Sequence, residues 1–128
     1  MKKRWGTEQT VVNQRVGASG YCLKHMVVEA GKRSSRHRHA RKCETFVITS
    51  GILILRVGKA KLQKHFPEEK ILVTPGTWHW FGSETGATFV EVSTIDHPDD
   101  TERDPNELSG DLERGDVPFV KKRGKLCS

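Results

Sequence analysis

Residues 31–51 read Gly31-Lys-Arg-Ser-Ser-Arg-His37-Arg-His39-Ala-Arg-Lys-Cys-Glu44-Thr-Phe-Val-Ile-Thr-Ser-Gly51, and they carry the strongest structural signal in the chain. On a β-strand, side chains two positions apart project to the same side, so His37 and His39 project together. Glu44 follows after a short turn, where it can begin the next strand. Two imidazoles and a carboxylate that converge on one point suit a borderline divalent cation. This stretch therefore predicts short strands that carry a metal site.

A further histidine lies in residues 74–81, Thr74-Pro-Gly-Thr-Trp-His79-Trp-Phe. The Pro-Gly pair is typical of a turn, and this turn can deliver His79 to the same site as a fourth ligand. Clusters of His and Glu at ligand spacing are typical of metal sites. The predicted ligands are therefore His37, His39, Glu44 and His79.

Around these segments the sequence consists of short apolar or alternating runs separated by Gly, Pro and Ser. Several short strands with turn signals between them are typical of an all-β sandwich or barrel. The expected strands lie in residues 11–12, 21–28, 44–48, 52–57, 71–73 and 88–92, and residues 29–35 are expected to form a loop. We therefore expect an all-β fold, an antiparallel β-sandwich barrel.

The chain has 128 residues, which is the usual size of one domain. After Ile95 the composition changes, because the following residues are rich in Asp, Glu, Pro and Gly and hold few apolar side chains. Such a segment cannot build a second core. We expect residues 1–95 to form the barrel with the metal site, and residues 96–128 to form a polar extension packed on the barrel or on a partner subunit.

The charge of the chain is unevenly distributed. The formal net charge is +6, residues 1–65 hold 15 Lys and Arg against 3 Asp and Glu, and residues 66–128 hold 7 against 13. A basic half is a feature of nucleic-acid-binding proteins, but the acidic second half argues against one continuous footprint. We interpret the two halves as packing together and compensating each other, and expect no nucleic-acid partner.

Nothing in the sequence indicates membrane insertion or a disulfide framework. The longest uncharged apolar run is Gly51–Leu55, far short of the roughly 20 residues of a membrane span, and no apolar segment follows Met1-Lys-Lys-Arg. Three cysteines without a CxxC pair suit reduced thiols. We expect a soluble cytoplasmic protein with no membrane partner.

The two histidine segments resemble the motifs of the cupin superfamily, whose fold is a jelly-roll barrel. The first cupin motif, G-x5-H-x-H-x4-E-x6-G, is matched at every specified position by residues 31–51. The second, G-x5-P-x-G-x2-H-x3-N, keeps Gly76 and His79. Glu68, Thr74 and Ser83 replace its Gly, Pro and Asn, and these departures affect turns rather than ligands. The resemblance covers about residues 10–95 and implies a metal-binding jelly roll.

Further segments, including Tyr21–Lys24 and Phe89–Thr94, resemble the sugar-isomerase branch of cupins, namely D-lyxose isomerase-type proteins and small sugar-related cupins. In that branch a Lys before the His-x-His pair and a Glu on a late strand project into the barrel beside the metal. Lys24 and Glu91 match those positions. Charged residues inside otherwise apolar strands are costly unless they are paired or functional, so a structural Lys24–Glu91 salt bridge, or charges that face outward, is the alternative.

The resemblance implies a metal-dependent aldose–ketose isomerisation through a cis-enediol. The expected cofactor is a divalent transition metal, Mn first and Zn, Fe, Co or Ni as alternatives, which would acidify the C2 proton of an open-chain sugar. We expect Glu91 to act as the base and Lys24 to handle hydroxyl protons, with the reverse assignment open. The alternatives are a non-catalytic sugar-binding or sensing module and an Fe(II)-dependent dioxygenase.

The expected partners are a small sugar or sugar phosphate and, by resemblance, a second copy of the chain in a homodimer. Basic residues surround the first motif. Strand alternation directs Arg36 and Arg38 away from the metal, so a phosphate clamp could come only from Arg33, Arg41 or Lys42.

Overall fold

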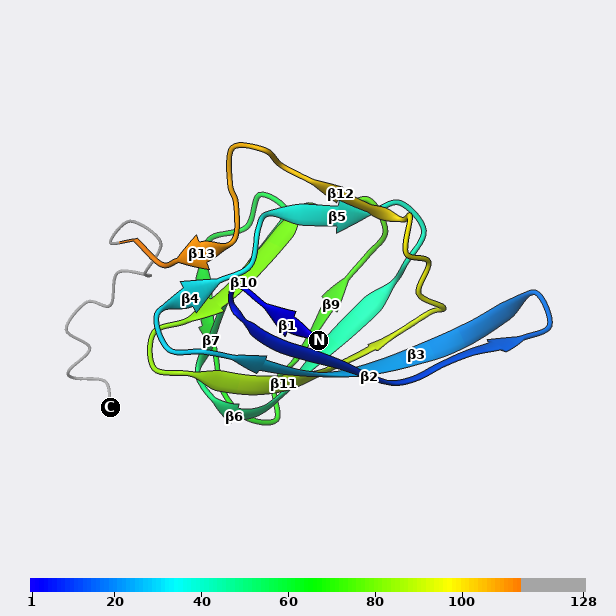
Figure 1. Cartoon of the computed structure of the whole chain (residues 1–128), viewed down its shortest axis with the longest axis horizontal. Helices are drawn as coiled ribbons and strands as arrows, with labels where there is room; N and C mark the ends of the chain where they lie inside the picture. The colour runs from blue at the N-terminus through cyan, green and yellow to red at the C-terminus, as the bar shows by residue number, and fades with distance from the viewer. Residues whose placement is uncertain (114–128) are drawn as a thin grey trace.

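The protein is described by a computed structural model in which residues 1–113 are placed as two antiparallel β-sheets that face each other (Figure 1). The predicted extension at residues 96–128 is therefore described only to residue 113, and Cys127 lies outside the described residues. No helix within residues 1–113 has the length and apolar character that a membrane crossing requires.

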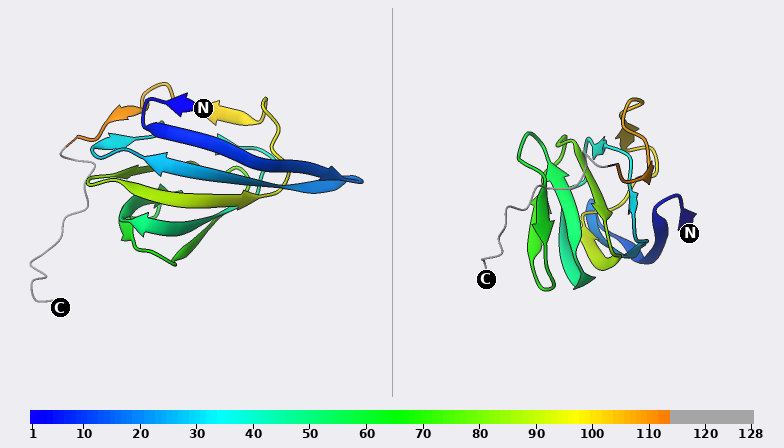
Figure 2. Two further views of the ribbon diagram at one scale, coloured as in Figure 1. Left: turned by 60° about the horizontal axis from the view of Figure 1, so that its bottom comes forward. Right: turned by 90° about the vertical axis from the view of Figure 1, so that its left-hand side faces the viewer.

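One sheet has six strands. In spatial order they are β1 (Lys2–Lys3), β2 (Gly6–Val16), β3 (Ser19–Val28), β11 (Ala87–Ser93), β6 (Glu44–Gly51) and β9 (Lys70–Val73). The β2–β3 hairpin is long and projects beyond the other strands (Figures 1 and 2). Two strands distant in sequence, β3 and β6, flank β11 on either side, so the middle of this sheet unites three parts of the chain.

The second sheet is organised around β10 (His79–Ser83). Its other strands are β4 (Lys32–Arg33), β5 (His37–His39), β7 (Leu53–Val57), β8 (Gln63–His65), β12 (Thr101–Arg103) and β13 (Gly110–Asp111). One edge of β10 pairs with β7, which pairs with β8, and the other edge pairs with β4 and β5. β12 pairs with β5 and β13 with β4, so part of the acidic segment after residue 95 extends this sheet.

The expected all-β antiparallel fold is confirmed, whereas several strand boundaries differ from the prediction. β2 begins at Gly6, whereas the sequence predicted a strand only from residue 11. The earlier part was missed because nearly all side chains of β2 are exposed and its sequence lacks an alternating apolar pattern. β4 lies inside the expected loop at residues 29–35. β1, β8, β12 and β13 were not predicted, since strands of two or three residues are too short to show a period.

The space between the sheets is apolar at one end and charged at the other. β3, β6 and β11 bury every second side chain, as half-buried strands do. Toward one end the inward residues join the core, which consists of Trp5, Met26, Val28, Phe46, Ile48, Leu53, Leu55, Val73, Phe81, Ala87 and Phe89. Toward the other end the inward positions carry Lys24, Glu44 and Glu91, all buried. A functional site is therefore built as a continuation of the core.

Two motif glycines are required by the backbone. Gly51 has a φ of 72°, and a Cβ at this position would lie 2.2 Å from the carbonyl oxygen of Gly86. Gly76 has a φ of 78° in the turn before His79, a conformation that L-residues with side chains rarely adopt. These turns set where β6 ends and where β10 begins.

Candidate metal centre

Three histidines meet at the charged end of the barrel. His37 and His39 lie on β5, and His79 begins β10, where it pairs in register with His37. One ring nitrogen from each lies within 4.8 Å of the others. The structure thus brings the three predicted histidine ligands together, as the strand alternation of β5 and the turn at Gly76 require.

Each of these rings is oriented by a contact at Nδ1. His37 Nδ1 lies 2.8 Å from the carbonyl oxygen of Ser35, and His79 Nδ1 lies 2.9 Å from that of Thr77. Since a carbonyl only accepts, both Nδ1 atoms carry the proton and donate it. His39 Nδ1 lies 3.2 Å from the hydroxyl of Thr101 on β12. This arrangement leaves Nε2 of a neutral ring with a free lone pair, as is usual for metal-binding histidines.

Glu44 reaches the same point from the opposite sheet. Its Oε2 lies 3.1 Å from Nε2 of His79 and 3.5 Å from Nε2 of His39, and its side chain is 1% exposed. Both carboxylate oxygens of Glu44 and Nε2 of His79 are buried without a hydrogen-bond partner. A carboxylate oxygen and an imidazole nitrogen thus lie 3.1 Å apart, and a cation bound between them would satisfy both.

The donor separations fit a single small cation. Two atoms that each lie about 2.1 Å from one ion are about 3.0–3.4 Å apart at octahedral or tetrahedral angles. The contacts of Glu44 with His79 and His39 span nearly this range. Imidazoles with one carboxylate are the donor set of Mn, Fe, Co, Ni and Zn sites rather than of Ca or Mg sites. The residues present therefore fit a divalent transition metal.

The protonation of these groups also suits metal binding. Burial and the nearby His79 ring lower the pKa of His37 to about 3, and burial lowers the pKa of His39 to about 4. Burial alone would raise the pKa of Glu44, but His79, Lys42 and His39 hold it at about 2. At neutral pH His37 and His39 are uncharged and Glu44 is ionised. No proton has to leave them before a cation binds.

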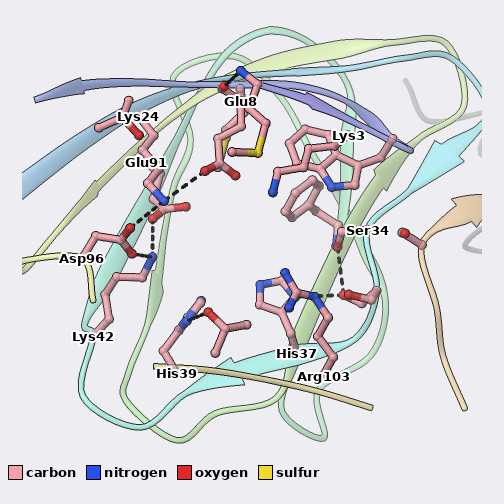
Figure 3. Close-up of a pocket in the computed structure, with 18 of the residues that line it drawn as sticks. Lys3, Glu8, Lys24, Ser34, His37, His39, Lys42, Glu91, Asp96 and Arg103 are labelled. Carbon is pink, nitrogen blue, oxygen red and sulfur yellow. Dashed lines mark hydrogen bonds and ion pairs between the residues drawn. The ribbon is translucent and has the colours of Figure 1, made fainter. Parts of the chain in front are cut away.

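A cavity of about 590 Å³ opens in front of His37 and His39 (Figure 3). Lys24 and Glu91, the two predicted chemical residues, both line it. They lie opposite each other in register on β3 and β11, and both are buried. The inward alternation inferred from the sequence therefore describes both residues correctly.

Lys24 and Glu91 each have a different ion-pair partner. Lys24 Nζ lies 3.1 Å from Glu8 Oε2 and 3.1 Å from Asp96 Oδ2. Glu91 Oε2 lies 2.9 Å from Nζ of Lys42, which also lies 3.1 Å from Asp96 Oδ1. The alternative of a direct Lys24–Glu91 salt bridge is thus replaced by a network of two lysines and three carboxylates.

The network gives its acids and bases different protonation states. Burial and the charge of Glu44 raise the pKa of Glu91 to about 7, although Lys42 opposes this rise. Burial disfavours the charge of Lys42, but Glu91 and Glu44 hold its pKa above the ordinary value. Burial and the charge of Lys42 lower the pKa of Lys24. The carboxylates Glu8, Glu91 and Asp96 outweigh them, so its pKa is also raised. Near neutral pH, Glu91 exchanges a proton while both lysines stay charged.

Lys42 was expected only as one of the basic residues near the first motif. The structure places it in the wall of the cavity. Lys42 precedes Glu44 by two residues, so the same alternation that located the ligands could have located it. Glu8, Asp96 and Thr101 left no such signal, because β2 is polar throughout and residues 96–101 show no period.

The other basic and aromatic residues near the motif lie outside the cavity. Arg36 and Arg38 stack on Trp78, on the side away from the histidines, and Arg33 stacks on Trp80. Arg41 pairs with Asp99 and Asp100. Of the three residues suggested as a phosphate clamp, Lys42 lines the cavity, whereas Arg33 and Arg41 do not. The aromatic residues that line the cavity are Trp5 and Phe81.

The family model described as "Cupin domain" matches residues 24–94, more than half of the chain. The chain belongs to the cupin family. The matched region contains both histidine segments together with Lys24 and Glu91, so the resemblance to cupins is confirmed. The narrower resemblance to sugar-isomerase cupins stays a prediction. A comparison with curated protein sequences finds no match.

Solved structures agree with the fold of this cupin. KdgF from Halomonas sp. matches with a TM-score of 0.62 at 12% identity, covering 72% of this chain and 80% of that one. A cupin-like protein from Thermotoga maritima matches with a TM-score of 0.64 at 15% identity, covering 85% and 79%. Oxalate decarboxylase from Bacillus subtilis matches with a TM-score of 0.59 at 16% identity, covering 65% of this chain and 23% of that one. At such identities the likeness establishes the fold alone.

Proposed function

We propose that this cupin is a metal-dependent enzyme that interconverts a small aldose and its ketose. The observation that carries the proposal is that one cavity is lined both by His37 and His39 of the transition-metal donor set and by a buried carboxyl group, Glu91, whose pKa is raised to about 7. A binding module has no need of a buried acid that gains and loses its proton near neutral pH. A proton-transfer enzyme does.

The metal would be held by His37, His39, Glu44 and His79. When bound, a divalent transition metal polarises the carbonyl of an open-chain sugar and makes the neighbouring C–H more acidic. The orienting contacts at Nδ1 fix the direction of each histidine lone pair before binding, so the site is organised in advance.

Glu91 is the base in this proposal. Its carboxylate takes the proton from C2 and returns it to C1, while the O2 hydroxyl proton moves to O1, so that the aldose becomes a ketose without any external oxidant. Lys24 suits the base role less well, because its contacts with Glu8 and Asp96 accompany a raised pKa and keep it protonated. A charged Lys24 donates hydrogen bonds to the sugar oxygens whose protons move.

The proposal is tested with C2-deuterated pentoses, hexoses and their phosphates. Metal-loaded protein should release deuterium into water from at least one sugar and form the matching ketose. Glu91→Gln keeps the side-chain shape and removes the proton acceptor, so turnover should fall by about two to four orders of magnitude while metal content is unchanged. Glu29→Gln, an exposed position, is the matched control and should keep full turnover.

The same experiment separates the alternatives. If the wild type binds a sugar but releases no deuterium from it, the chain is a binding or sensing module. If turnover requires oxygen, the dioxygenase interpretation replaces isomerisation, because isomerisation proceeds equally under anaerobic conditions.

A further inference from the structure

More Lys and Arg than Asp and Glu side chains line the cavity. They are Lys3, Arg4, Lys24, Lys42 and Arg103 against Glu8, Glu91 and Asp96. All three carboxylates are engaged by Lys24 or Lys42 at distances of 2.9–3.1 Å. The remaining cations therefore face the cavity without an acidic partner from its own wall.

Arg103 is the most informative of these cations. It is the single Lys or Arg from Asp96 to Glu113, a stretch that holds eight Asp and Glu. It lies on β12, where it pairs in register with His37, while Thr101 two residues earlier pairs with His39. Because Thr101 contacts the His39 ring and alternate residues of a strand share a face, Arg103 lies on the histidine side of β12.

The two residues next to Arg103 in the chain, Glu102 and Asp104, each form an ion pair. Glu102 binds Arg38 at 2.8 Å, and Asp104 binds Arg36 at 2.9 Å. Arg36 and Arg38 themselves lie against Trp78, away from the cavity. Within residues 1–113, the Arg103 guanidinium forms no ion pair, even though acidic residues flank it on both sides. Strand alternation thus separates one cation from the surrounding acids and directs it toward the metal centre.

Lys3 approaches from another wall. It lies on β1, pairs with Gly6 and carries no ion pair within the described part of the chain. Figure 3 shows its side chain entering the cavity across from His37 and Arg103. Lys3 and Arg103 belong to different sheets, so a group bound by both would bridge two walls of the cavity.

We propose that Arg103 and Lys3 form an anion subsite, and that the sugar acted on by this cupin carries a carboxylate or a phosphate. This inference rests on the proposed function and names its substrate class. The guanidinium fork binds either group through two parallel hydrogen bonds, and an ammonium adds a point charge. With the anionic group held at the mouth, the opposite end of a short sugar extends toward Glu91 and the histidines.

The test compares sugars that differ in charge. Full-length protein loaded with Mn²⁺ is titrated calorimetrically with D-glucose, D-glucuronate and D-glucose 6-phosphate. Hydrogen bonds to a charged group predict that at least one anionic sugar binds about 10–100-fold more tightly than D-glucose. The carboxylate and phosphate arms show which anion the subsite prefers. The preference should shrink as NaCl rises, because the subsite lies at the exposed mouth.

Variants assign the effect to the subsite. Arg103→Gln should remove most of the preference and Lys3→Gln part of it, while binding of D-glucose stays unchanged. Arg56→Gln removes an exposed arginine of β7 outside the cavity, and it should keep the full preference. The inference is overturned if D-glucose binds as tightly as both anionic sugars, if none of the three binds, or if Arg103→Gln behaves like Arg56→Gln. Because binding is measured here, a lost preference leaves the deuterium test of isomerisation standing, and failed exchange leaves the anion preference measurable.

Discussion

Glu44 and Glu91 are two buried carboxyl groups that differ in protonation because their surroundings differ. Glu44 lies among His79, Lys42 and His39, which favour its ionised form and hold its pKa at about 2. Glu91 pairs with Lys42, but its burial together with the charge of Glu44 raises its pKa to about 7. The first group is suited to hold a cation and the second to move a proton.

The titration of Glu91 can be measured directly. In metal-free protein, ¹³C NMR of the glutamate side-chain carboxyls should show one resonance that titrates at about 7, and Glu91→Gln should remove it. A protonated carboxyl cannot act as a base, so turnover of metal-loaded protein should rise as pH increases through the Glu91 titration measured in that same metal-loaded form. Lys42→Met should move the midpoint upward because it removes the cation that favours the carboxylate, whereas Zn²⁺ should move it downward for the opposite reason.

A Glu91 carboxyl that titrates at its ordinary value near 4.5 would contradict this assignment. Lys32→Met, which removes a surface lysine that pairs with Asp111, is the matched control and should leave the titration of Glu91 unchanged.

For single residues, the sequence predicted the direction of side chains that lie on the same strand. Alternation along three strands was enough to direct Lys24, His37, His39 and Glu91 inward. It could not say which charges would meet, because ion pairs such as Lys42–Glu91 and Lys24–Asp96 join distant segments through lengths and angles that a one-dimensional pattern does not contain.

β12 and the residues before it connect the acidic segment to the metal centre. Asp100 accepts hydrogen bonds from the backbone N–H groups of Ala40, Arg41 and Lys42 at 3.0–3.1 Å. These bonds fix the turn that leads from β5 to Glu44. Thr101, the next residue, contacts the ring of His39. The segment after residue 95 thus contributes to the site as well as to the sheet.

Thr101→Val tests this contribution, since valine preserves the shape and removes the hydroxyl. Losing a group that orients a metal-binding histidine typically weakens metal affinity by about 10–100-fold. We expect a loss of this size in competition titrations with a zinc-binding dye. Thr7→Val on the exposed part of β2 should change nothing. Equal affinity of Thr101→Val and wild type would show that the hydroxyl does not orient His39.

Strands β3, β6, β7 and β11 were largely predictable, because they alternate or run continuously apolar, whereas the longest strand, β2, has no such pattern and was largely missed. The short strands were not predictable either. β4, β12 and β13 have two or three residues each. They form because β10, β5 and β4, respectively, offer an edge to pair with, which is a property of the assembled sheet rather than of the local sequence.

For the whole molecule, the uneven charge of the sequence corresponds to pairing between its two halves. Basic residues of the first half meet acidic residues of the second in Lys32–Asp111, Arg36–Asp104 and Arg38–Glu102. These contacts agree with the interpretation that the halves compensate each other. The predicted homodimer stays a prediction.

The metal centre joins the two sheets. His37, His39 and His79 lie on the second sheet, and Glu44 lies on the six-stranded one. A bound ion would therefore link the two layers at the charged end, where the apolar core no longer does so. Substitution of a ligand should therefore lower the metal content of the protein. Thermal melting of the same variant shows whether it still folds.

The most direct test of the account is the metal content of the protein after equilibrium dialysis against Mn²⁺, Zn²⁺, Co²⁺ or Ni²⁺, measured by elemental mass spectrometry. We predict about one transition-metal ion per chain, bound by the three histidines and Glu44. The double variant His37→Ala, His39→Ala should bind essentially none, whereas His25→Ala, outside the cavity, should retain the ion. A folded wild-type protein that stays metal-free in all four dialyses would contradict it.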